Sequence, residues 1–226
     1  MTQPPASARE QLRALAGDPA VAERWAEFAL YDHYRAAAVL VLFGVLDGAP
    51  AVHAAGAVSR DLDVLLLARA TTLRSHAGEV AFPGGRIDPD DAGPVDAALR
   101  EAVEETGLDP AGVEVLGTLP EVPLPPSAHR VTPVLGWWAR PTPVRVVDDG
   151  ESSSVFRAPV ADLIDPANRW TTRLRRGGLS FTGPAWRVRV DGREHLIWGF
   201  TANVLDAMLA RLGWDEPWDH GRVIDL

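Results

Sequence analysis

The chain has 226 residues, a formal net charge of −9 at neutral pH and no cysteine. The missing cysteine excludes disulfides, thiolate nucleophiles and cysteine-ligated zinc or iron–sulfur sites. All 22 basic residues are arginine, so a Walker-type phosphate loop and Schiff-base chemistry, which both need lysine, are excluded too. Because a polyanion requires a basic face, the acidic balance also predicts no nucleic-acid partner.

The beginning of the chain shows no secretory pattern, since residues 1–10 are polar and contain prolines. The longest apolar run, Ala36–Leu46, has eleven residues including a glycine, which is too short to span a bilayer. We therefore expect a soluble, cytoplasmic protein with no membrane partner.

The first third of the chain predicts two helices followed by buried strands. Spaced apolar residues from Ala8 to Leu30 suggest two short helices, which break at Gly17-Asp18-Pro19. Continuous hydrophobicity predicts strands at Ala36–Leu46 and Asp63–Arg69, and a short strand is expected at Glu79–Phe82.

The rest of the chain alternates strands with helices. A helix is predicted from Val95 to Thr106 with Gly107 as its stop, and two more at Pro159–Ile164 and Thr201–Leu212. The loop Pro120–Pro126 is rich in proline. Further strands are predicted, in chain order, at Val113–Leu119, Val131–Trp138, Val144–Val147, Ser154–Arg157, Ala185–Val190 and Glu194–Trp198.

The alternation of strands and helices fits an α/β or α+β fold. The last two predicted strands are joined by Asp191-Gly192, a strong hairpin signal. Because no linker, repeat or low-complexity block interrupts the chain, we expect one domain over residues 1–226. Its parts would be a helical extension (1–35), a core (36–212) and a tail (213–226).

The most informative stretch joins a glycine-rich turn, Phe82-Pro83-Gly84-Gly85, to the helix that carries Glu101, Glu104 and Glu105. These glutamates stand at i, i+3 and i+4, so they share one stripe of the helix. Three carboxylates so close repel one another unless a cation shares them. Because no lysine is near, we expect a hard divalent metal, Mg²⁺ or Mn²⁺.

These residues resemble the Nudix box, the signature of nucleoside-diphosphate-linked pyrophosphohydrolases. The matching positions are Gly85, Arg100, Glu101, Glu104, Glu105, Gly107 and Leu108. Two departures lie in the loop before the helix. Asp91 stands where the family pattern has Glu, and eight residues rather than seven separate it from Arg100. The role of Asp91 is therefore left open.

A second motif lies upstream and is similar to that of the coenzyme A pyrophosphatase branch of the family. It comprises Leu66-Leu67-Ala68-Arg69-Ala70, Arg74, Gly78 and Phe82-Pro83-Gly84-Gly85. Ala68 replaces a usual Thr. Its effect on the substrate site, and that of the run Ser152-Ser153-Ser154, is left open.

The resemblance implies a mixed β-sheet packed between helices (α/β/α) and a metal site. Glu101 and Glu105 would be the principal ligands. Glu104 would be a further ligand or a water-orienting base, and the Gly85 carbonyl would complete the set. Arg100 can reach Glu104 and would hold a carboxylate in ligand geometry.

The resemblance also suggests residues that contact the substrate. Arg69 and Arg74 would bind the coenzyme A part, unless they are ordinary surface arginines. Phe82 and Gly84 belong to the same motif, although Phe82 also suits simple packing. Glu151 matches the place of a loop carboxylate that acts as ligand or general base, and a solvated acidic turn is the competing interpretation.

We therefore expect a metal-dependent hydrolase of coenzyme A or an acyl-CoA, which yields a 4′-phosphopantetheine species and adenosine 3′,5′-bisphosphate. One alternative is the same chemistry on NADH or ADP-ribose, and another is a catalytically silent module that binds a nucleotide. The expected partner is a small molecule. The acyl chain, the working metal, the identity of the general base and the oligomeric state, including a homodimer, stay open.

Overall fold

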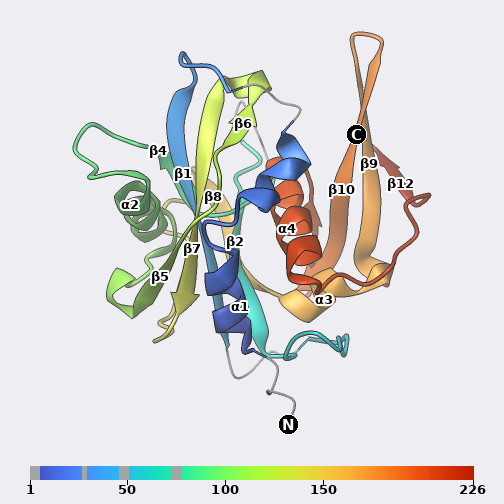
Figure 1. The fold of residues 1–226 in the computed structure, drawn as a ribbon, viewed down its shortest axis with the longest axis horizontal. Helices are drawn as coiled ribbons and strands as arrows, with labels where there is room; N and C mark the ends of the chain where they lie inside the picture. The colour runs from blue at the N-terminus through green and yellow to red at the C-terminus, as the bar shows by residue number, and fades with distance from the viewer. Residues whose placement is uncertain (1–5, 27–29, 46–50, 73–77) are drawn as a thin grey trace.

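The computed structural model describes residues 6–26, 30–45, 51–72 and 78–226 (Figure 1). The predicted site residue Arg74 lies outside the described residues.

The larger sheet has eight strands and is mixed. Its order is β3-β2-β1-β7-β5, with β4 paired to β1, β6 to β7 and β8 to β2. β1 runs antiparallel to β2 and β4 but parallel to β7. The strands are β1 (Arg35–Val45), β2 (Leu62–Arg69), β3 (Val80–Ala81), β4 (Gly84–Arg86), β5 (Val113–Thr118), β6 (Val122–Leu124), β7 (His129–Trp138) and β8 (Ser152–Pro159).

Helices cover both faces of this sheet, as predicted. Alternate residues of β1 point to opposite faces, so Leu40 and Leu42 pack with helix α2 (Pro94–Thr106) while Val41 and Phe43 face the other helices. Figure 1 shows α2 on one side of the sheet and α1 and α4 on the other. Each fully buried side chain of this size contributes about 1.5–3 kcal/mol relative to an exposed one.

The second helical layer combines three short segments with the longer helix α4. These are α1 (Ala8–Leu15), the 3₁₀ segment η1 (Pro19–Trp25), α3 (Val160–Ile164) and α4 (Gly199–Leu212). The prediction of two helical segments near the amino terminus is confirmed, the second being 3₁₀ rather than α. None of the helices in the described part of the chain combines the length and the hydrophobicity needed to cross a lipid bilayer.

A second, four-stranded sheet lies beyond α4 and was not predicted as such (Figure 1). It consists of β9 (Arg169–Arg176), β10 (Leu179–Val190), β11 (Arg193–Ile197) and β12 (Val223–Asp225) in the order β11-β10-β9-β12. The predicted hairpin between β10 and β11 is confirmed, with positive φ at Asp191 (50°) and Gly192 (76°). The predicted tail supplies β12, which pairs with β9.

The arginine-rich strand β9 is stabilised by contacts with distant residues. Arg169 lies between the rings of Trp186 and Trp218, 4.4 Å and 4.7 Å from their centroids, and forms an ion pair with Asp206. An arginine stacked on aromatic faces gains cation–π attraction when it is desolvated. The strand was missed because its own sequence has no apolar alternation.

Two other predictions in the middle of the chain are wrong. Val144–Val147 forms no strand, because this segment finds no pairing partner, although Val144 packs against the core under α2. The loop Pro120–Pro126 contains the short strand β6, which pairs with the beginning of β7. A proline is tolerated there because β6 is an edge strand.

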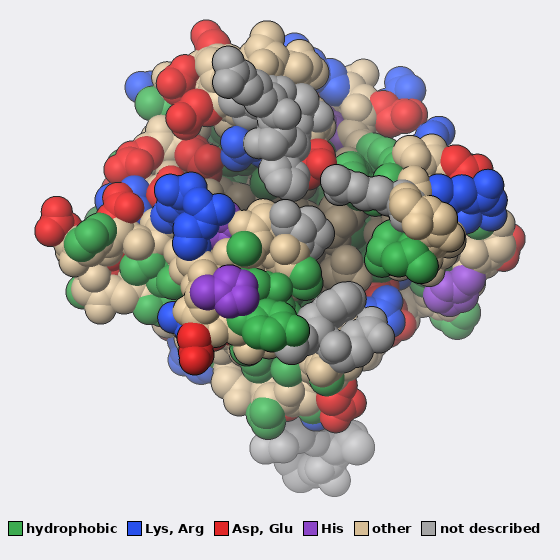
Figure 2. Space-filling view, turned by 90° about the horizontal axis from the view of Figure 1, so that it is seen from above, with side chains coloured by type: hydrophobic (Ala, Val, Ile, Leu, Met, Phe, Trp, Pro, Cys, Tyr) green, Lys and Arg blue, Asp and Glu red, His purple; other side chains and the backbone are tan. Residues whose placement is uncertain are grey.

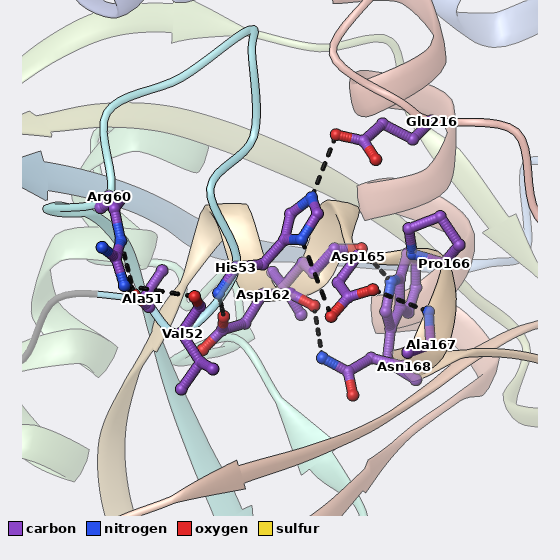
Figure 3. A network of polar contacts seen from close by, with 12 residues as sticks. Ala51, Val52, His53, Arg60, Asp162, Asp165, Pro166, Ala167, Asn168 and Glu216 are labelled. Atoms are coloured by element: carbon purple, nitrogen blue, oxygen red, sulfur yellow. Dashed lines mark hydrogen bonds and ion pairs between the residues drawn. The ribbon is translucent and has the colours of Figure 1, made fainter.

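A polar network fastens the loop before β2 to the rest of the fold (Figure 3). The His53 N–H donates to Asp162 at 2.9 Å, and the His53 ring lies 3.1 Å from a Glu216 carboxylate oxygen. Arg60 donates to the Ala51 carbonyl at 2.8 Å across the same loop. The loop is thus tied both to α3 and to the segment after α4.

Asp63 in β2 makes the stability of the fold depend on pH. It is 3% exposed, and its Oδ1 accepts no hydrogen bond from the described residues. Burial raises the pKa of Asp63 to about 7. The positive charge of Arg157 lowers this pKa, and the negative charges of Asp61 and Asp162 raise it further. The folded state therefore prefers the neutral carboxyl. The resulting stabilisation is complete below the usual pKa near 3.8 and is lost as the pH rises through about 7.

Replacing Asp63 by Asn should remove this dependence. As the pH rises from 4 to 8, the wild-type protein should lose on the order of 2–4 kcal/mol of unfolding free energy through this group, which Asp63→Asn should retain. Urea denaturation of both proteins at pH 5 and pH 8 measures the effect. A pH-independent difference between them would contradict the assignment.

Candidate active site

The helix α2 begins and ends where the sequence predicts. Pro94 occupies its first turn, and Gly107 ends it in the left-handed conformation (φ 66°), with its N–H donating to the Val103 carbonyl at 2.9 Å. Ala98 and Ala102 are fully buried against the sheet. This packing fixes the rotation of the helix, so that Glu101 and Glu105 face β4 while Glu104 stays largely exposed.

Two glycines let β4 lie close to both of its neighbours, strand β1 and helix α2. A methyl group at Gly84 would overlap the Ala38 carbonyl oxygen of β1 and stand 2.6 Å from the Val39 Cα. At Gly85 it would collide with the Glu101 carboxylate. The Gly84 N–H donates to Glu105 Oε2 at 2.9 Å. The predicted glycine turn thus lies directly against two of the predicted glutamates.

Glu105 is the most perturbed carboxylate of this group. Burial raises the pKa of Glu105 to about 7. The hydrogen bond from Gly84 and the charge of Arg69 oppose the rise, while the charges of Glu101 and Glu151 add to it. Burial also raises the pKa of Glu101, against the opposing effect of Arg100. The structure therefore brings Glu101, Glu151 and Arg69 within electrostatic reach of Glu105.

Arg100 organises the carboxylates around it. Its Nε and Nη2 each donate to Asp91 at 3.0 Å, and its Nη1 lies 3.1 Å from Glu101 and 3.2 Å from Glu104. The predicted contact with Glu104 is confirmed. Two hydrogen bonds from Arg100 hold the pKa of Asp91 below its usual range, with a further bond from the Asp88 N–H. Asp91, whose role the sequence left open, therefore anchors the arginine bidentately.

Arg100→Lys should lower activity about 10- to 100-fold, the usual cost of losing a group that orients a ligand. A lysine carries one point charge and cannot serve Asp91, Glu101 and Glu104 with a planar fork. Rates are measured across a Mg²⁺ titration. Arg100→Lys should need a higher Mg²⁺ concentration for half-maximal activity than the control Arg211→Lys, which changes an arginine paired with Asp18 at the surface. Identical titration curves for both variants would contradict the orienting role.

The remaining predicted site residues differ in how far they are buried. Glu104 keeps 57% of its side chain exposed, and Glu151 is exposed at the turn before β8, where its carbonyl accepts the Ala70 N–H at 2.9 Å. Arg69 is half-buried, and its Nε finds no acceptor among the described residues. Phe82 is 2% exposed and belongs to the main core, which favours the packing interpretation over contact with substrate.

The donor atoms suit a divalent metal that keeps part of its water shell. In the described part of the chain, no three Asp, Glu or His side chains converge into a ready-made metal cage. Glu101 and Glu105, however, are poorly solvated carboxylates whose mutual repulsion a cation would relieve. Mg²⁺ characteristically uses one or two carboxylates together with waters and substrate oxygens.

A pocket of about 240 Å³ opens beside this cluster. Its walls include the apolar side chains of Val39, Leu124, Val131 and Phe200 and the backbone of β4. Figure 2, which looks down on the upper end of the molecule in Figure 1, shows a surface hollowed near its middle and carboxylates gathered toward the α2 side. The pocket and the glutamates share Gly84 and Gly85 as a common wall.

Comparison with known proteins agrees with this geometry. Residues 49–176 match the family model described as the NUDIX domain. The uncharacterized Nudix hydrolase NudL of Salmonella paratyphi B is 41% identical over 151 residues, which cover 66% of this chain and 75% of that protein.

Similar solved structures include a NUDIX hydrolase from Nitrosomonas europaea, with 14% identity, a TM-score of 0.48 and coverage of 87% of this chain and 81% of that one. The NUDIX domain of Shewanella oneidensis NrtR, solved with ADP ribose, has 23% identity, a TM-score of 0.43 and coverage of 63% and 84%. The family model spans more than half of the chain, and NudL is matched over three quarters of its length; the chain therefore belongs to the Nudix family, the hydrolases of nucleoside diphosphate derivatives.

Proposed function

We propose that this Nudix hydrolase cleaves the diphosphate of coenzyme A or of an acyl-CoA. The products would be a 4′-phosphopantetheine species and adenosine 3′,5′-bisphosphate. The observation that carries the proposal is the position of Arg69. This arginine belongs to the motif that resembles the coenzyme A pyrophosphatase branch, and its charge acts on Glu105 of the Nudix box.

In this proposal the substrate diphosphate lies over Glu101 and Glu105, beside the backbone of Gly85. Arg100 holds Glu101 and Glu104 in place, and Asp91 holds Arg100. Arg69, whose Nε has no described acceptor, donates to a phosphate oxygen of the substrate. An arginine fork offers bidentate geometry for such oxygens.

Nudix hydrolases generally need a divalent metal such as Mg²⁺ or Mn²⁺, which neutralises phosphate charge and lowers the pKa of a water. Glu101, Glu105 and the Gly85 carbonyl would hold it, with Glu104 as a further donor. Glu151 is our candidate for the general base, because it is exposed yet close enough to Glu105 to influence its pKa. A base in this position can accept a proton from the attacking water.

The experiment is a Mg²⁺- or Mn²⁺-supplemented assay with coenzyme A, acetyl-CoA, NADH and ADP-ribose at equal concentration, with the products resolved by mass. We expect the coenzyme A compounds to be hydrolysed fastest, with both named products formed in equal amounts. Equal or faster hydrolysis of ADP-ribose or NADH would overturn the substrate assignment. No hydrolysis of any diphosphate would instead favour a silent nucleotide-binding module.

Glu151→Gln tests the choice of base within the same assay. If Glu151 accepts the proton, kcat should fall about 10²- to 10⁴-fold while KM changes little. Glu104→Gln is the matched control, since Glu104 is also an exposed glutamate beside the cluster. A larger loss in Glu104→Gln than in Glu151→Gln would move the role of base to Glu104.

A further inference from the structure

The two flanks of the glutamate cluster differ in chemistry. On one flank lies the pocket, whose side walls are formed by Val39, Leu124, Val131 and Phe200. Among the described residues that line it, Arg86 is the charged one, and it is exposed. Ser127 and His129 add polar groups. The interior therefore suits an uncharged, largely apolar ligand group, because an anion placed there would be desolvated without a buried counter-charge.

The other flank carries Arg69 at the end of β2. Strand β2 lies on one side of β1, and the pocket strand β7 lies on the other. Neighbouring strands are about 4.8 Å apart, and β1 and β4 lie between the two flanks, so three spacings separate β7 from β2, roughly 14 Å. Arg69 is half-buried, and its Nε, which is shielded from solvent, has no described acceptor, so the guanidinium brings an unneutralised positive charge to this flank that suits an anion.

The separation of the two flanks favours one orientation of the substrate in the site. A coenzyme A molecule has an anionic half, the nucleoside with its ribose phosphate, and an uncharged half, the pantetheine arm with its thiol or acyl group. The diphosphate joins the two halves and must lie at the glutamates for cleavage. The charge of Arg69 matches the first half, and the apolar walls of the pocket match the second.

We propose that the pocket between Phe200 and the β1–β7 strands is the subsite for the pantetheine arm and its acyl group. The phosphorylated nucleoside then lies on the Arg69 flank. This assignment rests on the proposed coenzyme A activity and adds to it the orientation of the substrate. It makes Phe200 and Leu124 specificity-determining residues, which act on binding of one half of the substrate and not on the reacting phosphorus.

The two halves of the substrate, used as separate ligands, test the orientation. Binding of 4′-phosphopantetheine and of adenosine 3′,5′-bisphosphate is measured by calorimetry in the presence of Mg²⁺. Phe200→Ala should weaken 4′-phosphopantetheine binding about ten-fold or more, as expected when an apolar wall is removed. It should change adenosine 3′,5′-bisphosphate binding less than about two-fold. Arg69→Gln should do the reverse, with a loss of about 10- to 100-fold for the bisphosphate.

Two further variants separate a binding effect from a folding effect. Leu212→Ala is the matched control, since Leu212 is partly buried at the opposite end of α4 and packs against the same core as Phe200. It should leave both affinities unchanged. Leu124→Trp fills the pocket from a different element and should weaken 4′-phosphopantetheine binding even if Phe200→Ala does not fold.

The outcomes are distinct. Loss of adenosine 3′,5′-bisphosphate binding in Phe200→Ala or Leu124→Trp would place the nucleoside in the pocket and overturn the orientation. Equal weakening of both ligands, or no binding of either half to the wild-type protein, would overturn it too. Hydrolysis of intact coenzyme A by the wild-type protein is measured separately, so a failure of the proposed activity is recognised independently of the binding pattern.

Discussion

Glu105→Gln is expected to reduce the proposed hydrolysis of coenzyme A on the order of 10²- to 10³-fold, because the metal that would stabilise developing charge loses a ligand. The substitution keeps a side-chain oxygen that can accept the Gly84 N–H, so the helix should stay docked on β4. What it removes is the negative charge next to Glu101. The loss should appear in kcat and in the Mg²⁺ dependence, both measured with saturating substrate.

The stability of the same variant provides the control. Burial raises the pKa of Glu105 to about 7, so ionisation of this group opposes folding as the pH rises through 7. Glu105→Gln should therefore unfold at the same or a higher urea concentration than the wild-type protein at pH 8. Full activity in the variant, or activity of the wild-type protein that ignores added metal, would refute the role given to Glu105.

Gly84→Ala is expected to destabilise the fold by about 3 kcal/mol or more, which combines backbone strain and overpacking. Gly84 has φ 157°, at the edge of the region that favours glycine. Its added methyl group would overlap the Ala38 carbonyl and crowd the Val39 backbone, and neither can move without disturbing β1. Thermal and urea denaturation of the purified variant measure the loss.

Gly56→Ala is the matched control for this change, because a methyl group at Gly56 meets nothing within 4 Å. It should alter the unfolding free energy by less than about 0.5 kcal/mol. A second comparison, Gly85→Ala, should push the Glu101 carboxylate aside and lower activity more than stability. If Gly84→Ala were as stable as Gly56→Ala, the close approach of β4 to β1 would not be a feature of the folded protein.

The local parts of the site could be predicted from the sequence because they depend on short-range geometry. The spacing of Glu101, Glu104 and Glu105 places them on one helix stripe wherever the helix lies. Pro94 and Gly107 mark its ends for equally local reasons. The same spacing does not reveal that Glu105 is buried while Glu104 is largely exposed, since that difference arises from the packing of α2 on β4.

The second sheet needed long-range contacts. Strand β9 pairs with β10 and β12, and two tryptophans from elsewhere in the chain stack on its Arg169; none of these contacts leaves a periodic pattern in its sequence. Val144–Val147 has the composition of a strand but no neighbour to pair with. A segment forms a strand only when a neighbouring strand pairs with it, so composition alone does not predict strands.

The sequence by itself determined the helix that carries the glutamates, the glycine turn and an α/β or α+β fold, because each leaves residues at fixed local intervals. Its motifs also indicated the family and, through that resemblance, the mixed sheet between helices. Tertiary structure alone decided which carboxylate is buried, that Phe82 lies in the core, and that a pocket opens beside Gly84 and Gly85. These features depend on burial and on distances between segments far apart in the chain, and both are set only when the chain has folded.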